Sequence, residues 1–250
     1  MRTVDLNCDM GEGCPNDAEL LKYVSSANIA CGYHAGDADV MRRTVELAME
    51  SGAAIGAHPG YKDRDNFGRT EMSLSDDEVR RLVTEQLEAL ANICSSLGAR
   101  PHHVKPHGAL YNQAAKDRAL SRSIAEAVAA FDRELVFYGL SGSFLISEAE
   151  EAGLETSSEV FADRTYSSDG TLTPRSVNGA LITDPNGSIE QVLEMVEKQT
   201  VRSLSGETIP IKAETICIHG DGATAVDLAK TIRQALEQRE IRVRPQRFRT

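Results

Sequence analysis

"VKPHGALYN", residues 104–112, joins a short apolar run to a lysine, a proline, a histidine and a glycine. Side chains two positions apart in a strand point to the same side, so we expect Lys105 and His107 to project together. Pro106 has no N–H to donate to a neighbouring strand and is expected to end the pairing there. The stretch therefore predicts a strand whose carboxyl end delivers two polar side chains into one site.

Short apolar runs of this kind alternate with amphipathic helical stretches along the whole chain. Seven strands are predicted, at residues 3–8, 27–31, 53–57, 102–106, 135–139, 156–161 and 215–219. Strict alternation implies a parallel sheet covered by helices, and both a closed barrel and an open doubly wound sheet satisfy it. The barrel is favoured because no G-x-G-x-x-G follows the first strand and because polar clusters follow nearly every strand. We predict a seven-stranded β/α barrel, an α/β fold, as a single domain over residues 1–250 with a basic tail at 242–250.

The connections between the predicted elements are uneven in length. The strand-to-helix connections at 58–74, 107–115 and 162–187 are long, and long connections in a compact domain usually carry function. In a β/α barrel all of them emerge at one end, which is the end that holds active sites. The segments 75–78, "SDDE", and 188–191, "SIEQ", are typical of helix starts, and 205–214 is expected to form a small hairpin on the opposite face.

Composition excludes several classes of function. The net charge is −11, from 38 acidic and 27 basic residues, which disfavours a nucleic-acid partner. No apolar run is long enough to span a bilayer, and no signal peptide is evident, so we expect a cytoplasmic protein without a membrane partner. The five cysteines lack C-x-x-C spacing, which argues against a disulfide framework or a structural zinc site. No P-loop sequence is present.

Ionisable side chains recur at the predicted carboxyl ends of the strands. Four of the six histidines stand there, each within two positions of glycine or proline. In a barrel all these groups meet at one rim, which predicts an active site. The rim candidates are Asn7, Asp9, Glu12, His34, Asp37, His58, Lys105, His107, Glu159, Asp163, Arg164, His219 and Asp221, with His102 and His103 interpreted as structural.

Three kinds of chemistry fit such a rim. The histidines and carboxylates could bind a divalent metal that activates water, although each ligand would come from a different strand. A metal-free site would use Lys105 and Arg164 to hold anions and the imidazoles and carboxylates to move protons. A covalent mechanism would need Cys8 or Cys31 as nucleophile, but both lie in apolar strands. Asp37 could simply cap a helix, Gly220 and Gly222 could serve a tight turn, and Arg69 could grip a substrate carboxylate from its loop.

Six motifs in the same order resemble the LamB/YcsF lactam-utilisation family of 5-oxoprolinase A subunits. They are "DLNCDMGE", "SANIACGYHAGD", "GAHPGY" with "FGR", "VKPHGALYN", "SEVFADRTY" and "ICIHGDG", between about residues 3 and 238. The resemblance implies a distorted seven-stranded β/α barrel similar to glycoside hydrolases and polysaccharide deacetylases. It also implies ATP-dependent hydrolysis of 5-oxo-L-proline to L-glutamate together with B and C subunits. ATP would be a co-substrate, with Mg²⁺, at a site that partner subunits could share.

On that reading each rim residue receives a hypothetical role. His107 and His219 would be general acid/base groups, with Asp9 or Asp221 orienting one of them, and Lys105 would stabilise charge on the lactam or phosphoryl oxygen. Glu159 would position water or the ring N–H, and His34 and His58 would complete the wall or bind a metal. Substrate contacts are expected from Asn7, Asp37, Arg69, Arg164, Gly220 and Gly222. The rival functions are a metal-dependent hydrolase or deacetylase of a carbohydrate or amide, and a non-catalytic scaffold subunit.

Overall fold

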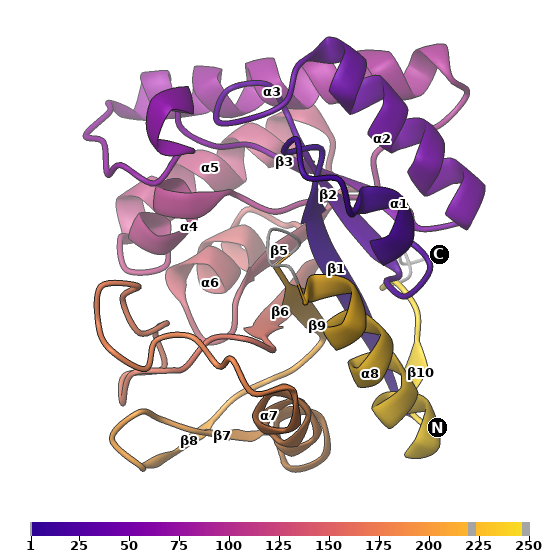
Figure 1. Ribbon diagram of the computed structural model, residues 1–250. Coiled ribbons are helices and arrows are strands. Elements are labelled where there is room, and N and C mark those ends of the chain that lie inside the picture. The colour runs from indigo at the N-terminus through magenta and orange to yellow at the C-terminus, as the bar shows by residue number, and fades with distance from the viewer. Residues whose placement is uncertain (1, 220–223, 247–250) are drawn as a thin grey trace.

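The computed structural model describes residues 2–219 and 224–246, and in it seven parallel strands close into a barrel (Figure 1). Each strand pairs with the next in the order β1, β2, β3, β4, β5, β6, β9, and β9 pairs again with β1. The strands are β1 (Thr3–Met10), β2 (Ser26–Ala30), β3 (Ala54–His58), β4 (His103–Val104), β5 (Val136–Leu140), β6 (Thr156–Phe161) and β9 (Thr215–Ile218). The predicted seven-stranded barrel is confirmed.

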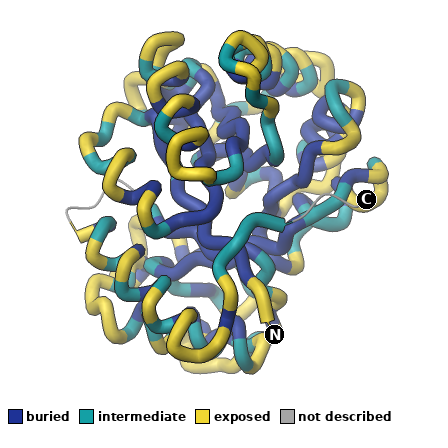
Figure 2. Tube along the Cα trace, turned by 90° about the vertical axis from the view of Figure 1, so that its right-hand side faces the viewer, coloured by how far each residue is buried: buried dark blue, intermediate teal, exposed yellow. Residues whose placement is uncertain are grey.

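Helices surround the strands and cover the outside of the barrel (Figure 1). Burial follows this layering: the strands are buried, and exposed residues gather on the outer faces of the helices (Figure 2). Every residue of β2 and of β5 is buried, as expected for strands packed on both faces. The helices are α1 (Asp17–Leu20), α2 (Ala38–Ser51), α3 (Asp76–Ser96), α4 (Gly108–Ala114), α5 (Arg118–Phe131), α6 (Phe144–Glu151), α7 (Pro185–Lys198) and α8 (Ala225–Gln238), with a short 3₁₀ turn at Arg64–Asn66.

Two predicted helix starts had different outcomes. The capping box at the start of α3 is confirmed, because Ser75 and Glu78 each hydrogen-bond the other's main-chain N–H. The start predicted at 188–191 is wrong. Helix α7 begins three residues earlier at Pro185, and the Asp184 side chain accepts from the N–H groups of Asn186 and Gly187. An aspartate followed by proline is itself a strong start signal, because proline at the first helical position lacks the N–H that would go unpaired.

The hairpin after α7 is formed by β7 (Thr200–Arg202) and β8 (Thr208–Pro210), so it lies earlier in the chain than predicted. Its position also differs from the prediction. The N–H of Leu204 donates to the carbonyl of Tyr166 at 2.8 Å, which places the hairpin against the loop that follows β6. The expectation of a hairpin at the opposite face is therefore wrong.

The basic tail begins as an ordered strand. β10 (Arg242–Val243) pairs in parallel with the first residues of β1, beside the barrel proper. The carbonyl of Gln246 also accepts a hydrogen bond from His102 at 2.8 Å, so the tail from 242 to 246 packs against the barrel rather than forming a free end. In the parts of the chain that the structure covers, none of the helices combines the length and apolarity that crossing a membrane requires.

Candidate active site

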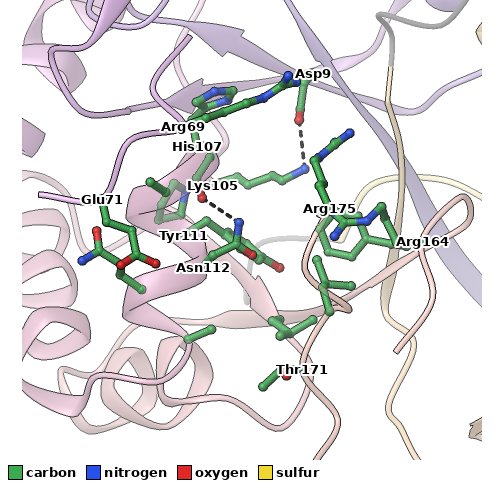
Figure 3. A pocket seen from close by; sticks show the side chains of 18 of the residues that line it. Asp9, Arg69, Glu71, Lys105, His107, Tyr111, Asn112, Arg164, Thr171 and Arg175 are labelled. Atoms are coloured by element: carbon green, nitrogen blue, oxygen red, sulfur yellow. Dashed lines mark hydrogen bonds and ion pairs between the residues drawn. The ribbon is translucent and has the colours of Figure 1, made fainter. Parts of the chain in front are cut away.

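The carboxyl ends of the barrel strands surround a cavity of about 650 Å³. Asp9 comes from β1, His58 from β3, Lys105 and His107 from the segment after β4, and His219 from the segment after β9. Figure 3 shows Asp9, Lys105 and His107 close together, with Arg164 and Arg175 reaching in from the loop after β6. The structure thus brings together side chains that lie up to 210 positions apart in the sequence, as the barrel predicts.

Lys105 is the charged centre of the cavity floor. Its Nζ lies 2.9 Å from Asp9 Oδ1, 2.9 Å from Glu159 Oε1 and 3.0 Å from Cys217 Sγ. Nζ also lies 3.3 Å from Asn7 Oδ1, so the three N–H bonds of the ammonium group are fully used within the protein. Lys105 therefore bridges two buried carboxylates, and the expected donation to a substrate oxygen would require one of these contacts to break.

A layer of hydrogen-bonded side chains supports this floor from below. Asn7 Nδ2 donates to Glu159 Oε1 at 3.0 Å, and Tyr111 donates to Glu159 Oε2 at 2.7 Å. Asn28 Nδ2 bridges Asn7 Oδ1 and Asp9 Oδ1 at 2.7 and 2.8 Å. Asn7 and Glu159 are fully buried and do not line the cavity. Their expected contacts with substrate or water are corrected to supporting contacts that fix Lys105 and Asp9.

Opposite charges dominate the electrostatics of the floor. Burial disfavours the charged form of Asp9, but His58 and Lys105 hold the pKa of Asp9 well below its usual range. Burial likewise opposes the charge on Lys105, yet Asp9, Cys217 and Glu159 raise the pKa of Lys105 well above its usual value. Asp9 and Lys105 therefore form a buried ion pair at the cavity surface.

Three imidazoles and one carboxylate form a second group beside Asp9, which we call the imidazole cluster: Glu12, His34, His58 and His107. The rings of His34 and His107 stack in parallel with centroids 3.7 Å apart. His107 Nδ1 lies 2.9 Å from His58 Nε2, and His107 Nε2 lies 2.9 Å from the carbonyl oxygen of Phe67. Both ring nitrogens of His107 thus have partners within the protein, so its expected role as a general acid or base stays a prediction that requires one of these contacts to open.

The imidazoles of the cluster differ in their affinity for protons. Burial, reinforced by the charge on His58, lowers the pKa of His34 to about 3. The pKa of His107 is also lowered, by burial and by the charges of His58 and His34. Burial acts in the same direction on His58, but the nearby Asp9 raises its pKa above the usual value. A cation in this cluster is therefore favoured at His58, on the side facing Asp9.

His219 forms a separate dyad at the other side of Asp9. Its Nδ1 lies 2.8 and 2.9 Å from the two carboxylate oxygens of Asp163, so Nε2 is the nitrogen that can meet a substrate. Despite burial, His219 keeps the pKa of Asp163 below its usual value. A ring nitrogen of His219 and a carboxylate oxygen of Asp9 lie within 4.8 Å of each other. Among the described residues, Asp163 rather than Asp9 is thus the carboxylate that contacts Nδ1 and orients His219.

Basic side chains give the cavity walls a positive character. Arg69, Lys116, Arg164 and Arg175 all line it. Arg164 stabilises its own loop, because its guanidinium donates to the carbonyl of Thr173 at 2.6 Å. Burial, together with the charge of Arg175, lowers the pKa of Arg164 to about 10. Arg175 enters from the same loop, opposite Glu71 and Asn112 (Figure 3). Anionic groups can be bound between these cations.

Two other expectations are resolved by position. Asp37 is exposed and caps α2, accepting from the N–H groups of Asp39 and Val40 at 3.0 and 2.9 Å, so its expected substrate contact is corrected to a capping role.

Cys8 and Cys31 are buried, and burial raises the pKa of both thiols, so neither is an activated nucleophile. The expected roles of Gly220, Asp221 and Gly222 lie outside the described residues and stay predictions.

Sequence reasoning missed several residues of the site. It placed Glu12 and Asp163 at the rim without a role, and it assigned nothing to Tyr111 or Arg175. The available signal was weak: Tyr111 lies one helical turn after His107 in the opening motif, and Arg175 stands in the longest strand-to-helix connection. The partner of each group depends on how the barrel closes.

Comparisons with known proteins bear on the family and the fold of the chain. The A subunit of 5-oxoprolinase from Brevibacillus brevis is 53% identical over 241 residues, covering 94% of this chain and 95% of that protein. The crystal structure of a lactam utilization protein from Thermus thermophilus superposes with a TM-score of 0.91 at 43% identity, covering 97% of this chain and 99% of that one.

More distantly, a structure of T48 deacetylase with substrate matches with a TM-score of 0.54 at 13% identity, over 97% of this chain and 87% of that one, and shows the fold alone. The predicted deacetylase-like barrel is thus confirmed. The LamB/YcsF family model matches residues 4–249. The chain therefore belongs to the LamB/YcsF family.

Proposed function

We propose that this chain is the A component of an ATP-dependent 5-oxoprolinase. The observation that carries the proposal is the match to the Brevibacillus brevis 5-oxoprolinase chain along nearly the full length of both proteins. The reaction consumes 5-oxo-L-proline, ATP and two waters and yields L-glutamate, ADP and phosphate. B and C subunits complete the enzyme, and ATP with Mg²⁺ binds at a site that those subunits share or supply.

The chemistry of the substrate fits the walls of the cavity. 5-Oxoproline is a small ring with one carboxylate, and opening its amide generates negative charge on the former carbonyl oxygen. Arg69 and Arg175 line the cavity as candidates to bind the substrate carboxylate or a phosphorylated oxygen. A volume of about 650 Å³ leaves room for the ring and a phosphoryl group together.

Proton transfer is assigned to the His219 dyad. Opening the lactam requires that water lose a proton and that the departing ring nitrogen gain one. With Nδ1 held by Asp163, His219 Nε2 can carry out either transfer. A water between His219 and Asp9 would be within hydrogen-bond reach of both, because these groups lie within 4.8 Å.

The Asp9–Lys105 pair is assigned an electrostatic and positioning role. Asp9 is held as a carboxylate, which can orient a water but binds protons weakly. Lys105 keeps both Asp9 and Glu159 in place and places a fixed positive charge under the reacting ring. Glu159 and Asn7 act through Lys105 rather than on the substrate.

An omission assay tests the proposal. Purified chain, B and C subunits would be combined with 5-oxo-L-proline and MgATP, and L-glutamate and phosphate would be measured together. We expect both products in a one-to-one ratio only when all three components are present. Equal glutamate formation by B and C alone would contradict the proposal, as would glutamate formation independent of ATP.

A second candidate function is a metal-dependent amide hydrolase, such as a deacetylase. The imidazole cluster favours it, because three imidazoles and a carboxylate converge at the mouth of a deacetylase-like barrel. It is tested by acetate release from an N-acetylated sugar by the chain alone, with and without added Zn²⁺. Acetate release at an enzymatic rate would support this function over lactam hydrolysis.

A further inference from the structure

The donor atoms of the imidazole cluster converge on one point. Glu12 Oε1 lies 3.2 Å from His34 Nε2, 3.3 Å from His107 Nδ1 and 3.9 Å from His58 Nε2, and the latter two nitrogens are 2.9 Å apart. Four ligands around a tetrahedral metal with bonds of about 2.0–2.1 Å stand about 3.3 Å from one another. The spacing of the cluster is thus close to that of a filled coordination shell.

The far side of the imidazoles fixes their tautomers. His58 Nδ1 lies 2.7 Å from the carbonyl oxygen of Lys105, and His107 Nε2 lies 2.9 Å from that of Phe67. A carbonyl oxygen only accepts, so each of these nitrogens carries the hydrogen. In the neutral rings, His58 Nε2 and His107 Nδ1 then carry no hydrogen. Their lone pairs point at each other across a distance of 2.9 Å. Two acceptors at that distance require a cation between them.

That cation is either a proton or a metal ion. A proton would join one pair of nitrogens only, and His34 Nε2 would then make a separate hydrogen bond to Glu12 Oε1, 3.2 Å away. A metal ion satisfies all four donors at once. Main-chain carbonyls that accept from the remote N–H of the ligating imidazoles are the usual outer partners of metal-bound histidine, and two of the three rings have one.

Glycines make room for this arrangement. A Cβ on Gly60 would lie 2.7 Å from His34 Nδ1, and a Cβ on Gly68 would lie 2.8 Å from His34 Cβ and 2.9 Å from His107 Cδ2. Gly60 and Gly68 therefore allow the two stacked rings to stand side by side with both edges directed at Glu12. Burial of the cluster excludes most competing water, since His34, His58 and His107 are each at least 95% buried.

We propose that Glu12, His34, His58 and His107 form a binding site for a divalent transition-metal ion. Three imidazoles and one carboxylate suit Zn²⁺, Co²⁺, Ni²⁺ or Mn²⁺, whereas Mg²⁺ and Ca²⁺ prefer oxygen ligands. A bound metal would place a divalent charge next to Asp9 and would act as a Lewis acid where a fifth ligand can join the four protein ligands, and His219 would remain the histidine available for proton transfer. The inference deepens the proposed function, but it is tested by metal content and can fail independently of turnover.

The test uses the full-length chain, stripped with a chelator and then titrated with Zn²⁺ or Co²⁺. We expect about one equivalent of tightly bound metal by elemental analysis and, with Co²⁺, a visible absorption band of a tetrahedral or five-coordinate site. Glu12→Gln and His107→Ala should each weaken binding by at least about 100-fold, because even an outer partner of a ligand contributes about 10- to 100-fold. Circular dichroism and thermal melts would establish that each variant folds.

Two control variants distinguish this site from its neighbour, the group of Asp9, Cys217 and His219. His219→Asn and Cys217→Ser should retain the full equivalent of metal. Failure of the wild-type chain to bind any of these ions at micromolar concentration would overturn the inference. It would also be overturned if Glu12→Gln bound metal as tightly as wild type, or if the two control variants lost the metal instead.

Discussion

Lys105 contributes both to the stability of the fold and to the charge of the cavity. It is 2% exposed and contacts the carboxylates of Asp9 and Glu159, both at 2.9 Å. The strand-end position of Lys105 was predictable from its spacing to His107, but its contacts were not, because both carboxylates come from strands distant in the sequence. What appeared from the sequence to be a substrate-facing cation is, in the structure, the counter-ion of two buried acids.

Replacing Lys105 by methionine should therefore affect both folding and turnover. The change removes the cation that lies between the buried carboxylates of Asp9 and Glu159. Without their shared counter-ion, the two carboxylates repel each other. Breaking a buried ion pair from one side costs about 3–5 kcal/mol of unfolding free energy, and denaturant unfolding would measure it. Turnover in the reconstituted complex should be lost.

A second variant separates the two effects. Lys105→Met combined with Glu159→Gln removes one of the two unpaired charges with little change in shape. It should recover part of the lost stability without recovering turnover. A single Lys105→Met variant as stable as wild type would show that the pair makes no net contribution.

Asp163 illustrates a role that only the structure assigns. It accepts from His219 Nδ1 through both carboxylate oxygens, at 2.8 and 2.9 Å. Asp163→Asn should lower kcat on the order of 100-fold while KM changes little, because the imidazole loses its orientation and charge partner. Asp169→Asn on the same loop is the matched control and should turn over normally. A normal kcat for Asp163→Asn would remove the dyad from the mechanism.

The same carboxylate gives a pH prediction with a defined sign. The pKa of Asp163 is lowered in the folded protein, with His219 outweighing the effect of burial. Its contribution to stability is thus present above the unfolded value of about 3.9 and is lost as the pH falls through the lowered folded pKa. The difference in unfolding free energy between wild type and Asp163→Asn should be largest near neutral pH and should shrink below pH 4. A difference that stays constant down to pH 3 would contradict this account.

At the scale of elements, the strands were more predictable than the helices and the hairpin. Strand positions follow from apolar runs, and all seven were placed within a few residues because each is buried on both faces. The start of α7 was misplaced because the capping-box pattern at Ser188 competes with the Asp184–Pro185 signal, and the latter determines where the helix begins. The hairpin was misplaced and β10 was not predicted, because their partners, Tyr166 and Thr3, are set by tertiary contacts.

The pairing of β3 with β4 depends on a contact between two strands. Strand β4 is two residues long, and the imidazole of His103 packs over Gly56 of β3. A Cβ on Gly56 would lie 2.0 Å from His103 Nε2, closer than any real contact. Gly56→Ala should therefore destabilise the fold by about 3 kcal/mol, the upper part of the usual range for overpacking. Thermal or denaturant unfolding would measure the loss.

A double-mutant cycle tests the cause of that loss. In a His103→Ala background the ring is gone, so adding Gly56→Ala should cost much less than it does in wild type. An equal cost in both backgrounds would mean that the strand, rather than the imidazole, rejects the methyl group.

At the scale of the whole molecule, barrel closure determines which groups meet. The sequence predicted correctly that the strand ends converge, because parallel strands in a barrel all end at one face. It did not predict how the convergent groups divide into the Lys105 floor, the imidazole cluster and the His219 dyad. That division depends on side-chain distances of a few ångströms between β1, β3, β4 and β9, which no spacing along the chain encodes.

The central claim is that lactam opening takes place in this cavity, with His219 moving the proton. The most direct test is the rate of ATP-dependent conversion of 5-oxo-L-proline to L-glutamate by the complex of this chain with B and C subunits, comparing wild type with His219→Asn. The variant should fold and assemble as wild type does while glutamate formation falls at least about 100-fold, the range expected for loss of a general acid/base group. Glutamate formation at the wild-type rate by the assembled variant would contradict the account.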